Sequence, residues 1–94
     1  MKEVMKEKKS NSVTNFEAEK ITDNISVEFT RVVDSGNTTI SGTVKKDDQP
    51  VGDVSYDRNS NFLITRIKPY SILAREEVAA VHAAIPGYVN EMLS

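Results

Sequence analysis

The last part of the chain carries an apolar stripe with helical spacing, which constrains the fold more than any other feature. Between residues 71 and 94, apolar side chains recur every three or four positions, at Ala74, Val78, Val81, Ile85, Tyr88 and Met92. This spacing places them on one face of an α-helix. Such a face needs an apolar surface to cover, and four strand-like runs precede it. The sequence therefore predicts an α+β domain.

Turn-forming residues separate the four runs, beginning near Asp34, Lys46, Asp57 and Lys68. The runs themselves are rich in Val, Ile, Thr, Phe and Tyr, which favour strands. In the first three runs apolar and polar residues alternate, which is typical of an antiparallel sheet with one face in water. Short connections favour a four-stranded antiparallel meander over residues 24–68, with the C-terminal helix packed on one face.

The alternation of the strands and the stripe of the helix together predict the hydrophobic core. We expect it to contain Ile25, Val27, Phe29, Ile40, Val44, Val54, Tyr56, Ile64, Val78, Val81, Ile85 and Val89.

The helix has a plausible start and an interruption. Ser71 can cap the first turn, because its hydroxyl can accept from free backbone amides. Pro86 and Gly87 fall inside the stripe, and an internal proline removes a helical hydrogen bond. Since the stripe keeps its phase across Pro86, we expect a kinked helix rather than a full break.

The first twenty residues differ from the rest in composition. They are polar and rich in Lys and Glu, so we expect a flexible charged arm over residues 1–20 and one small domain over residues 21–94. The domain carries seven basic and ten acidic side chains, a net charge of −3. An acidic domain does not attract phosphate backbones through its overall field.

The fourth run departs from simple alternation, because Phe62, Leu63 and Ile64 are consecutive and Ile67 follows. Both of its faces are therefore apolar. We assign Ile64 to the core, and Leu63, Thr65 and Ile67 to a second face that is a candidate protein interface. That face could meet the N-terminal arm, a second copy of the chain or another protein, or its side chains could simply be half exposed.

No motif for catalysis, metal binding or a cofactor stands out. The chain has no cysteine, and its single histidine, His82, borders the helical stripe without a second ligand nearby. Residues 57–61 resemble the start of a calcium loop, but the glycine and the closing glutamate are missing. Asp47 and Asp48 lie in a predicted turn. We therefore expect no enzyme activity, no metal and no cofactor.

These observations favour a non-enzymatic interaction or accessory protein, acting as a homodimer or bound to a larger protein. Neither a secretory signal nor a membrane-spanning run is found in the sequence, so we expect a cytoplasmic protein that does not contact membranes.

The expected order, four antiparallel strands followed by a helix, resembles the repeat unit of the PUR and whirly single-stranded nucleic-acid binders. The resemblance covers residues 25–93 in element order alone. It implies units that act in pairs and an alternative function in binding single-stranded nucleic acid. The candidate contacts are then Lys8, Lys9, Arg31, Arg66 and Lys68. The polar face of the expected sheet lacks stacking aromatic residues, so a protein partner is favoured.

Overall fold

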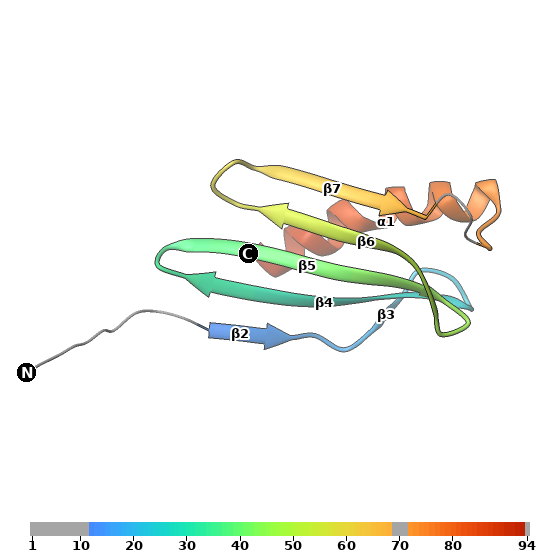
Figure 1. Ribbon diagram of the computed structural model, residues 1–94, viewed down its shortest axis with the longest axis horizontal. Coiled ribbons are helices and arrows are strands. Elements are labelled where there is room, and N and C mark those ends of the chain that lie inside the picture. Colours follow the sequence, from blue (N-terminus) through green and yellow to red (C-terminus); the bar gives the residue numbers. More distant parts are fainter. Residues whose placement is uncertain (1–11, 69–71, 94) are drawn as a thin grey trace, which may run out of the picture.

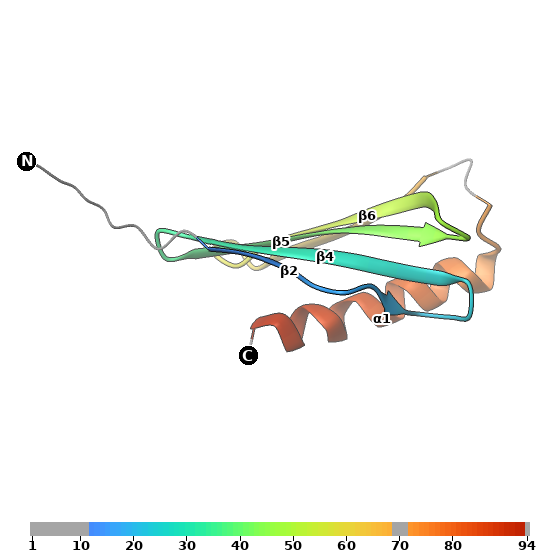
Figure 2. The same cartoon turned by 90° about the horizontal axis from the view of Figure 1, so that it is seen from below.

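One antiparallel sheet and one helix make up the computed structural model, which describes residues 12–68 and 72–93. The elements are β2 (Ser12–Asn15), β3 (Glu19–Lys20), β4 (Ile25–Asp34), β5 (Asn37–Lys46), β6 (Gln49–Asp57), β7 (Phe62–Ile67) and α1 (Arg75–Leu93). The strand order is β2-β4-β5-β6-β7, and β3 also pairs with β4 (Figure 1). Helix α1 covers one face of the sheet and leaves the other open (Figure 2). The predicted α+β class is confirmed.

The predicted number of four strands is wrong, because residues 12–20 also contribute strands. β2 pairs with the second half of β4, and β3 pairs with its first half. Between them, the Phe16 amide donates to the Phe29 carbonyl over 3.0 Å. The sequence did not reveal these strands, because their polar side chains show little alternation and the pairing is made by the backbone. Residues 1–11 of the predicted arm lie outside the described residues.

Two tight turns set the register of the central strands. The β4–β5 turn has positive φ at Ser35 (52°) and Gly36 (86°), and the β5–β6 turn has positive φ at Asp47 (49°) and Asp48 (66°). Two-residue turns of this kind match the twist of the strands that they join. Aspartate tolerates the left-handed region better than most residues. The paired carboxylates of Asp47 and Asp48 thus occupy a hairpin turn, as predicted.

The core lies between α1 and the covered face of the sheet. The predicted core is confirmed except at Ile64 and Val78, which are only half-buried, and the buried Val51 and Met92 were not predicted. Val51 escaped prediction because of a β-bulge: Val44 lies opposite Gly52, but the next pair is Lys45 with Pro50. The extra residue shifts the alternation of β6, so that Val51 turns into the core.

Helix α1 runs without interruption from Arg75 to Leu93 with Pro86 inside it, so the full break considered above does not occur. Its buried residues are Val81, Ile85, Val89 and Met92. They follow the predicted stripe closely. The predicted cap, Ser71, lies outside the described residues.

The first turn of α1 is fastened to the end of β5 through Glu77. Its Oε1 accepts a hydrogen bond from the Ala74 amide over 2.8 Å and pairs with Lys46 Nζ over 2.9 Å. The Lys46 ammonium also donates to the Ile72 carbonyl over 3.3 Å. The bond from the Ala74 amide, followed by that from Lys46, lowers the pKa of Glu77 from its ordinary value. Glu77 therefore caps the helix and holds it against the sheet.

Candidate interaction site

Strand β7 forms one edge of the sheet, and its side chains divide between the two faces. Leu63 lies opposite the buried Tyr56, and Thr65 lies opposite the buried Val54. Leu63 and Ile67 are half-buried and pack against the core. The candidate interface residues Leu63, Thr65 and Ile67 thus face the helix. The predicted assignment of faces is reversed for this strand.

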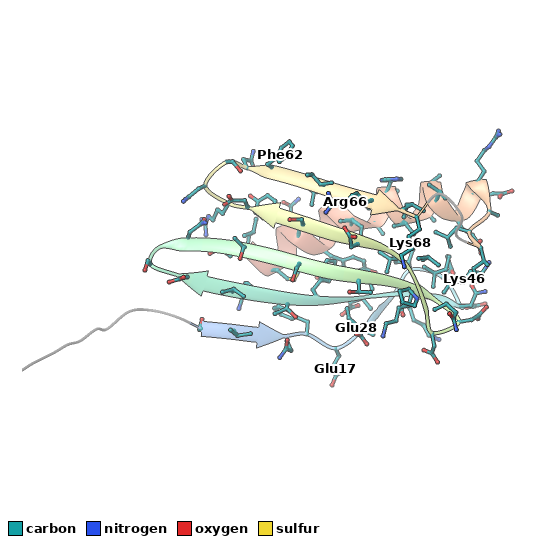
Figure 3. All side chains as sticks on the ribbon, in the orientation of Figure 1. Glu17, Glu28, Lys46, Phe62, Arg66 and Lys68 are labelled. Carbon is teal, nitrogen blue, oxygen red and sulfur yellow. The ribbon has the colours of Figure 1, made fainter. Side chains whose placement is uncertain are left out.

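The open face of β7 carries Phe62, Ile64 and Arg66 instead. These residues lie opposite Asp57, Ser55 and Asp53 of β6. Phe62 is 61% exposed, and Ile64 is half-buried. Arg66 Nε contacts Asp53 Oδ1 over 3.2 Å, and both side chains are more than half exposed. Figure 3 shows Phe62 and Arg66 along the outermost strand.

The turn before β7 decides which residues face the core. Residues 58–61 connect β6 to β7, and Asn61 has a positive φ of 53°. Asn61 Oδ1 accepts a hydrogen bond from the Tyr56 hydroxyl over 3.0 Å, and the Asn59 amide donates to Asp57 Oδ1 over 3.1 Å. These bonds place Leu63, rather than Ile64, beside Tyr56. Apolar residues on both faces left the sequence pattern ambiguous. The residues that resembled a calcium loop form this turn, as expected.

The backbone of β7 offers hydrogen-bonding groups at the edge of the sheet. The Lys68 amide donates to the Val51 carbonyl over 2.8 Å, so residues 68, 66, 64 and 62 direct their backbone groups toward β6. The backbone groups of Leu63, Thr65 and Ile67 then point away from the sheet. No strand lies beyond β7 in the part of the chain that the structure describes. The three residues predicted to form the interface therefore lie on this edge. They expose their backbone groups there, whereas their side chains face the helix.

Of the basic residues of the nucleic-acid alternative, the three that the structure describes do not converge. Arg31 lies opposite Ile40 on the covered face, where its Nη1 donates to the Met92 carbonyl over 2.5 Å. Arg66 lies on the open face beside Asp53, and Lys68 is an exposed residue just after β7. Lys8 and Lys9 lie outside the described residues. Two of the guanidinium groups are thus on opposite faces of the sheet, and each has a partner.

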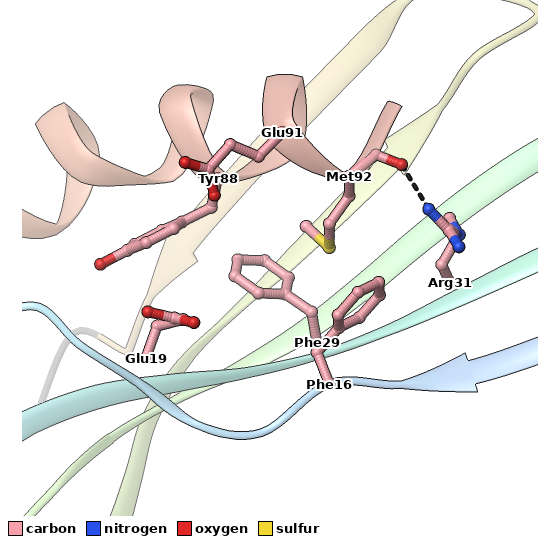
Figure 4. A pocket seen from close by; sticks show the side chains of 7 residues that line it. All are labelled: Phe16, Glu19, Phe29, Arg31, Tyr88, Glu91 and Met92. Carbon is pink, nitrogen blue, oxygen red and sulfur yellow. Dashed lines mark hydrogen bonds between the residues drawn. The ribbon is translucent and has the colours of Figure 1, made fainter. Parts of the chain in front are cut away.

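A small cavity of about 170 Å³ lies between residues 16–19, β4 and the end of α1 (Figure 4). It is lined by Phe16, Glu19, Phe29, Arg31, Tyr88, Glu91 and Met92. The guanidinium of Arg31 lies 5.3 Å from the centre of the Phe16 ring, and the rings of Phe29 and Tyr88 are 5.9 Å apart. Arg31 thereby ties the N-terminal strands to the last turn of α1.

Phe16 is the residue of this cluster that sequence reasoning missed. It was assigned to the charged arm, but it packs against the core. Two signals could have revealed it. Phe16 is the only aromatic residue among residues 1–20, and Arg31 interrupts the apolar face of the following strand. A cation beside an aromatic ring is a favourable pair.

The remaining chemical candidates do not assemble into a site. His82 is exposed on α1. Residues 12–68 and 72–93 contain no group of three or more His, Cys, Asp or Glu side chains arranged to hold a metal ion. Within the same ranges, no helix is long and apolar enough to cross a membrane.

Comparison with known proteins gives no relative for this arrangement. The chain matches no protein-family model, no curated protein and no solved structure. Its likeness to the PUR and whirly units therefore stays one of element order.

Proposed function

We propose that this chain is a non-enzymatic interaction protein that binds another polypeptide at the edge of β7. The bound segment would extend the sheet as an added strand. The observation that carries this proposal is the backbone direction of β7, whose Leu63, Thr65 and Ile67 groups point away from β6. Main-chain hydrogen bonds supply affinity when an extended peptide adds to an exposed edge.

The side chains of β7 support the same proposal. Proteins that keep a sheet edge unpaired usually protect it with proline, lysine or a very short strand. β7 has six residues and no proline, and its one charged residue, Arg66, is paired with Asp53. Phe62 adds an exposed ring at the start of the strand. This combination leaves an edge suited to pairing.

The test is an NMR titration with a peptide that has the sequence of residues 61–68, its ends blocked, at a protein concentration where the mass is that of a monomer. We expect amide exchange to slow at Leu63, Thr65 and Ile67. The amides of Ile64 and Arg66 provide an internal control, because β6 already engages them.

A Thr65→Pro variant is the matched test of the same edge. It removes an amide that points away from β6, so the existing sheet keeps its hydrogen bonds. We expect this variant to fold and to lose peptide binding. Unchanged exchange at all three edge amides of the unsubstituted protein, in a large molar excess of peptide, would contradict the proposed function.

A further inference from the structure

We infer that the strand added to β7 is the β7 strand of a second copy of the chain, paired antiparallel about a two-fold axis at Ile64. This inference rests on the proposed function and names the partner. It predicts a symmetric dimer in which two sheets join into one.

The direction of the backbone groups limits how two β7 strands can pair. Leu63, Thr65 and Ile67 carry the outward groups, so across the new edge an odd-numbered residue of one copy must lie opposite an odd-numbered residue of the other. A two-fold axis at Ile64 meets this requirement by placing Leu63 opposite Thr65 of the second copy. A shift of one residue would put outward groups opposite inward ones and is excluded.

Several two-fold axes along β7 would place outward groups opposite outward groups. Among these axes, the side chains favour the one at Ile64. With the axis at Ile64, Phe62 lies opposite Arg66 of the second copy, and the reverse pair forms by symmetry. An arginine beside an exposed ring is a favourable cation–π pair, and the two arginines do not face each other. The two Ile64 side chains meet at the centre on the open face. Every residue from Phe62 to Arg66 then has a partner.

The arrangement of layers also permits this dimer. A two-fold axis perpendicular to the sheet keeps both open faces on one side and both α1 helices on the other. Helix α1 packs on one face of the sheet (Figure 2). The opposite edge is less suitable, because β2 has only four residues and short edge strands resist pairing.

The test uses cysteine substitutions, since the chain has no cysteine of its own. In an Ile64→Cys variant, the two new thiols would face each other across the axis at a position where opposed side chains are close. We expect a disulfide-linked dimer under mild oxidation. Ser41→Cys is the matched control, because Ser41 is exposed on the same face but lies on the central strand β5. We expect this variant to stay largely without a disulfide crosslink in the same assay.

Light scattering across a dilution series accompanies the crosslinking. We expect the unsubstituted protein to form a dimer, and Thr65→Pro to weaken dimerisation by at least about tenfold, because the two symmetric hydrogen bonds of that amide are lost.

Three results would overturn the inference. A monomer at every concentration would exclude the second copy as partner. A dimer in which Ser41→Cys crosslinks as readily as Ile64→Cys would indicate packing of the open faces. A dimer in which neither variant crosslinks would place the contact elsewhere. If the peptide still binds at the edge amides in any of these cases, the proposed function stands and only the identity of the partner is wrong.

Discussion

At the scale of single residues, two glycines differ in whether the surrounding structure leaves room for a side chain. Gly52 is buried in β6 next to the bulge, and a Cβ atom there would meet the Arg66 carbonyl oxygen and lie 3.1 Å from Ile67 Cδ1. Gly87 lies in α1, and a Cβ atom there would meet nothing within 4 Å. The first glycine allows β6 and β7 to approach closely, whereas the second only adds backbone freedom.

We predict that Gly52→Ala lowers the free energy of unfolding by about 1–3 kcal/mol, because the backbone of β7 has to move to admit the methyl group. Gly87→Ala is the matched control and should raise the free energy of unfolding by about 0.5–1 kcal/mol, since alanine favours the helix. Urea denaturation of both variants measures the two effects. Equal stability of Gly52→Ala and the unsubstituted protein would show that β6 and β7 do not pack this closely.

At the scale of elements, the attachment of α1 to β5 depends on one carboxylate. Glu77 accepts from the Ala74 amide and pairs with Lys46, and these contacts lower its pKa. A carboxyl group with a lowered pKa in the folded state stabilises the fold while it is charged. That stabilisation is complete above the pKa of the unfolded chain, and it is lost as the pH falls through the pKa of the folded state.

We therefore predict that Glu77→Gln is less stable than the unsubstituted protein at neutral pH, and that the difference shrinks as the pH falls below the ordinary glutamate pKa of about 4.5. Denaturant unfolding over a pH series measures this difference. Glu76→Gln removes the same charge from the same helical turn but does not touch Lys46, so its effect at neutral pH should be smaller. A Glu77→Gln deficit that persists undiminished in acid would refute the role of the charge.

How far each element could be predicted depends on how strongly its side chains alternate. β4 and β5 bury one clear face, and their core residues followed from the sequence. In α1, Val81, Ile85 and Val89 followed as well, whereas Val78 is only half-buried and the buried Met92 was not predicted. β7 has apolar residues on both faces, so its orientation depended on the turn at residues 58–61 and on the Tyr56–Asn61 hydrogen bond. β2 and β3 pair through the backbone, and backbone pairing leaves little trace in a sequence. Leu63, Thr65 and Ile67 of the predicted interface lie on this edge strand, but their side chains face the helix rather than the open face.

At the scale of the whole molecule, the basic side chains of the sheet are distributed over both of its faces rather than clustered on one. Arg31 and Arg66 lie on opposite faces of the sheet, and each has an oxygen partner. Lys45 pairs with Glu28 on the open face over 3.7 Å. Binding to a nucleic-acid strand needs a continuous positive surface, and usually aromatic rings on which bases stack. On the open face, Phe62 offers one exposed ring, but the basic side chains of Lys45 and Arg66 are each paired with a carboxylate.

We predict no saturable binding of single-stranded oligonucleotides at low salt, measured by fluorescence anisotropy. The same titration at several salt concentrations provides the control, because binding through phosphate contacts weakens steeply as salt rises. Saturable binding with a steep salt dependence would restore the nucleic-acid alternative and would direct attention to Lys68 and to residues outside the described ranges.

The short turns of the sheet have a consequence for the rate and order of folding. From β4 to β7, each strand pairs with its neighbour in the chain, so closing each hairpin costs little loop entropy. Proteins dominated by such local contacts cross their folding barrier quickly. β2 must instead find β4 across the intervening residues, and α1 must return over the finished sheet. The hairpins are therefore expected to form early, with the N-terminal strands and the helix joining a surface that the hairpins have already built.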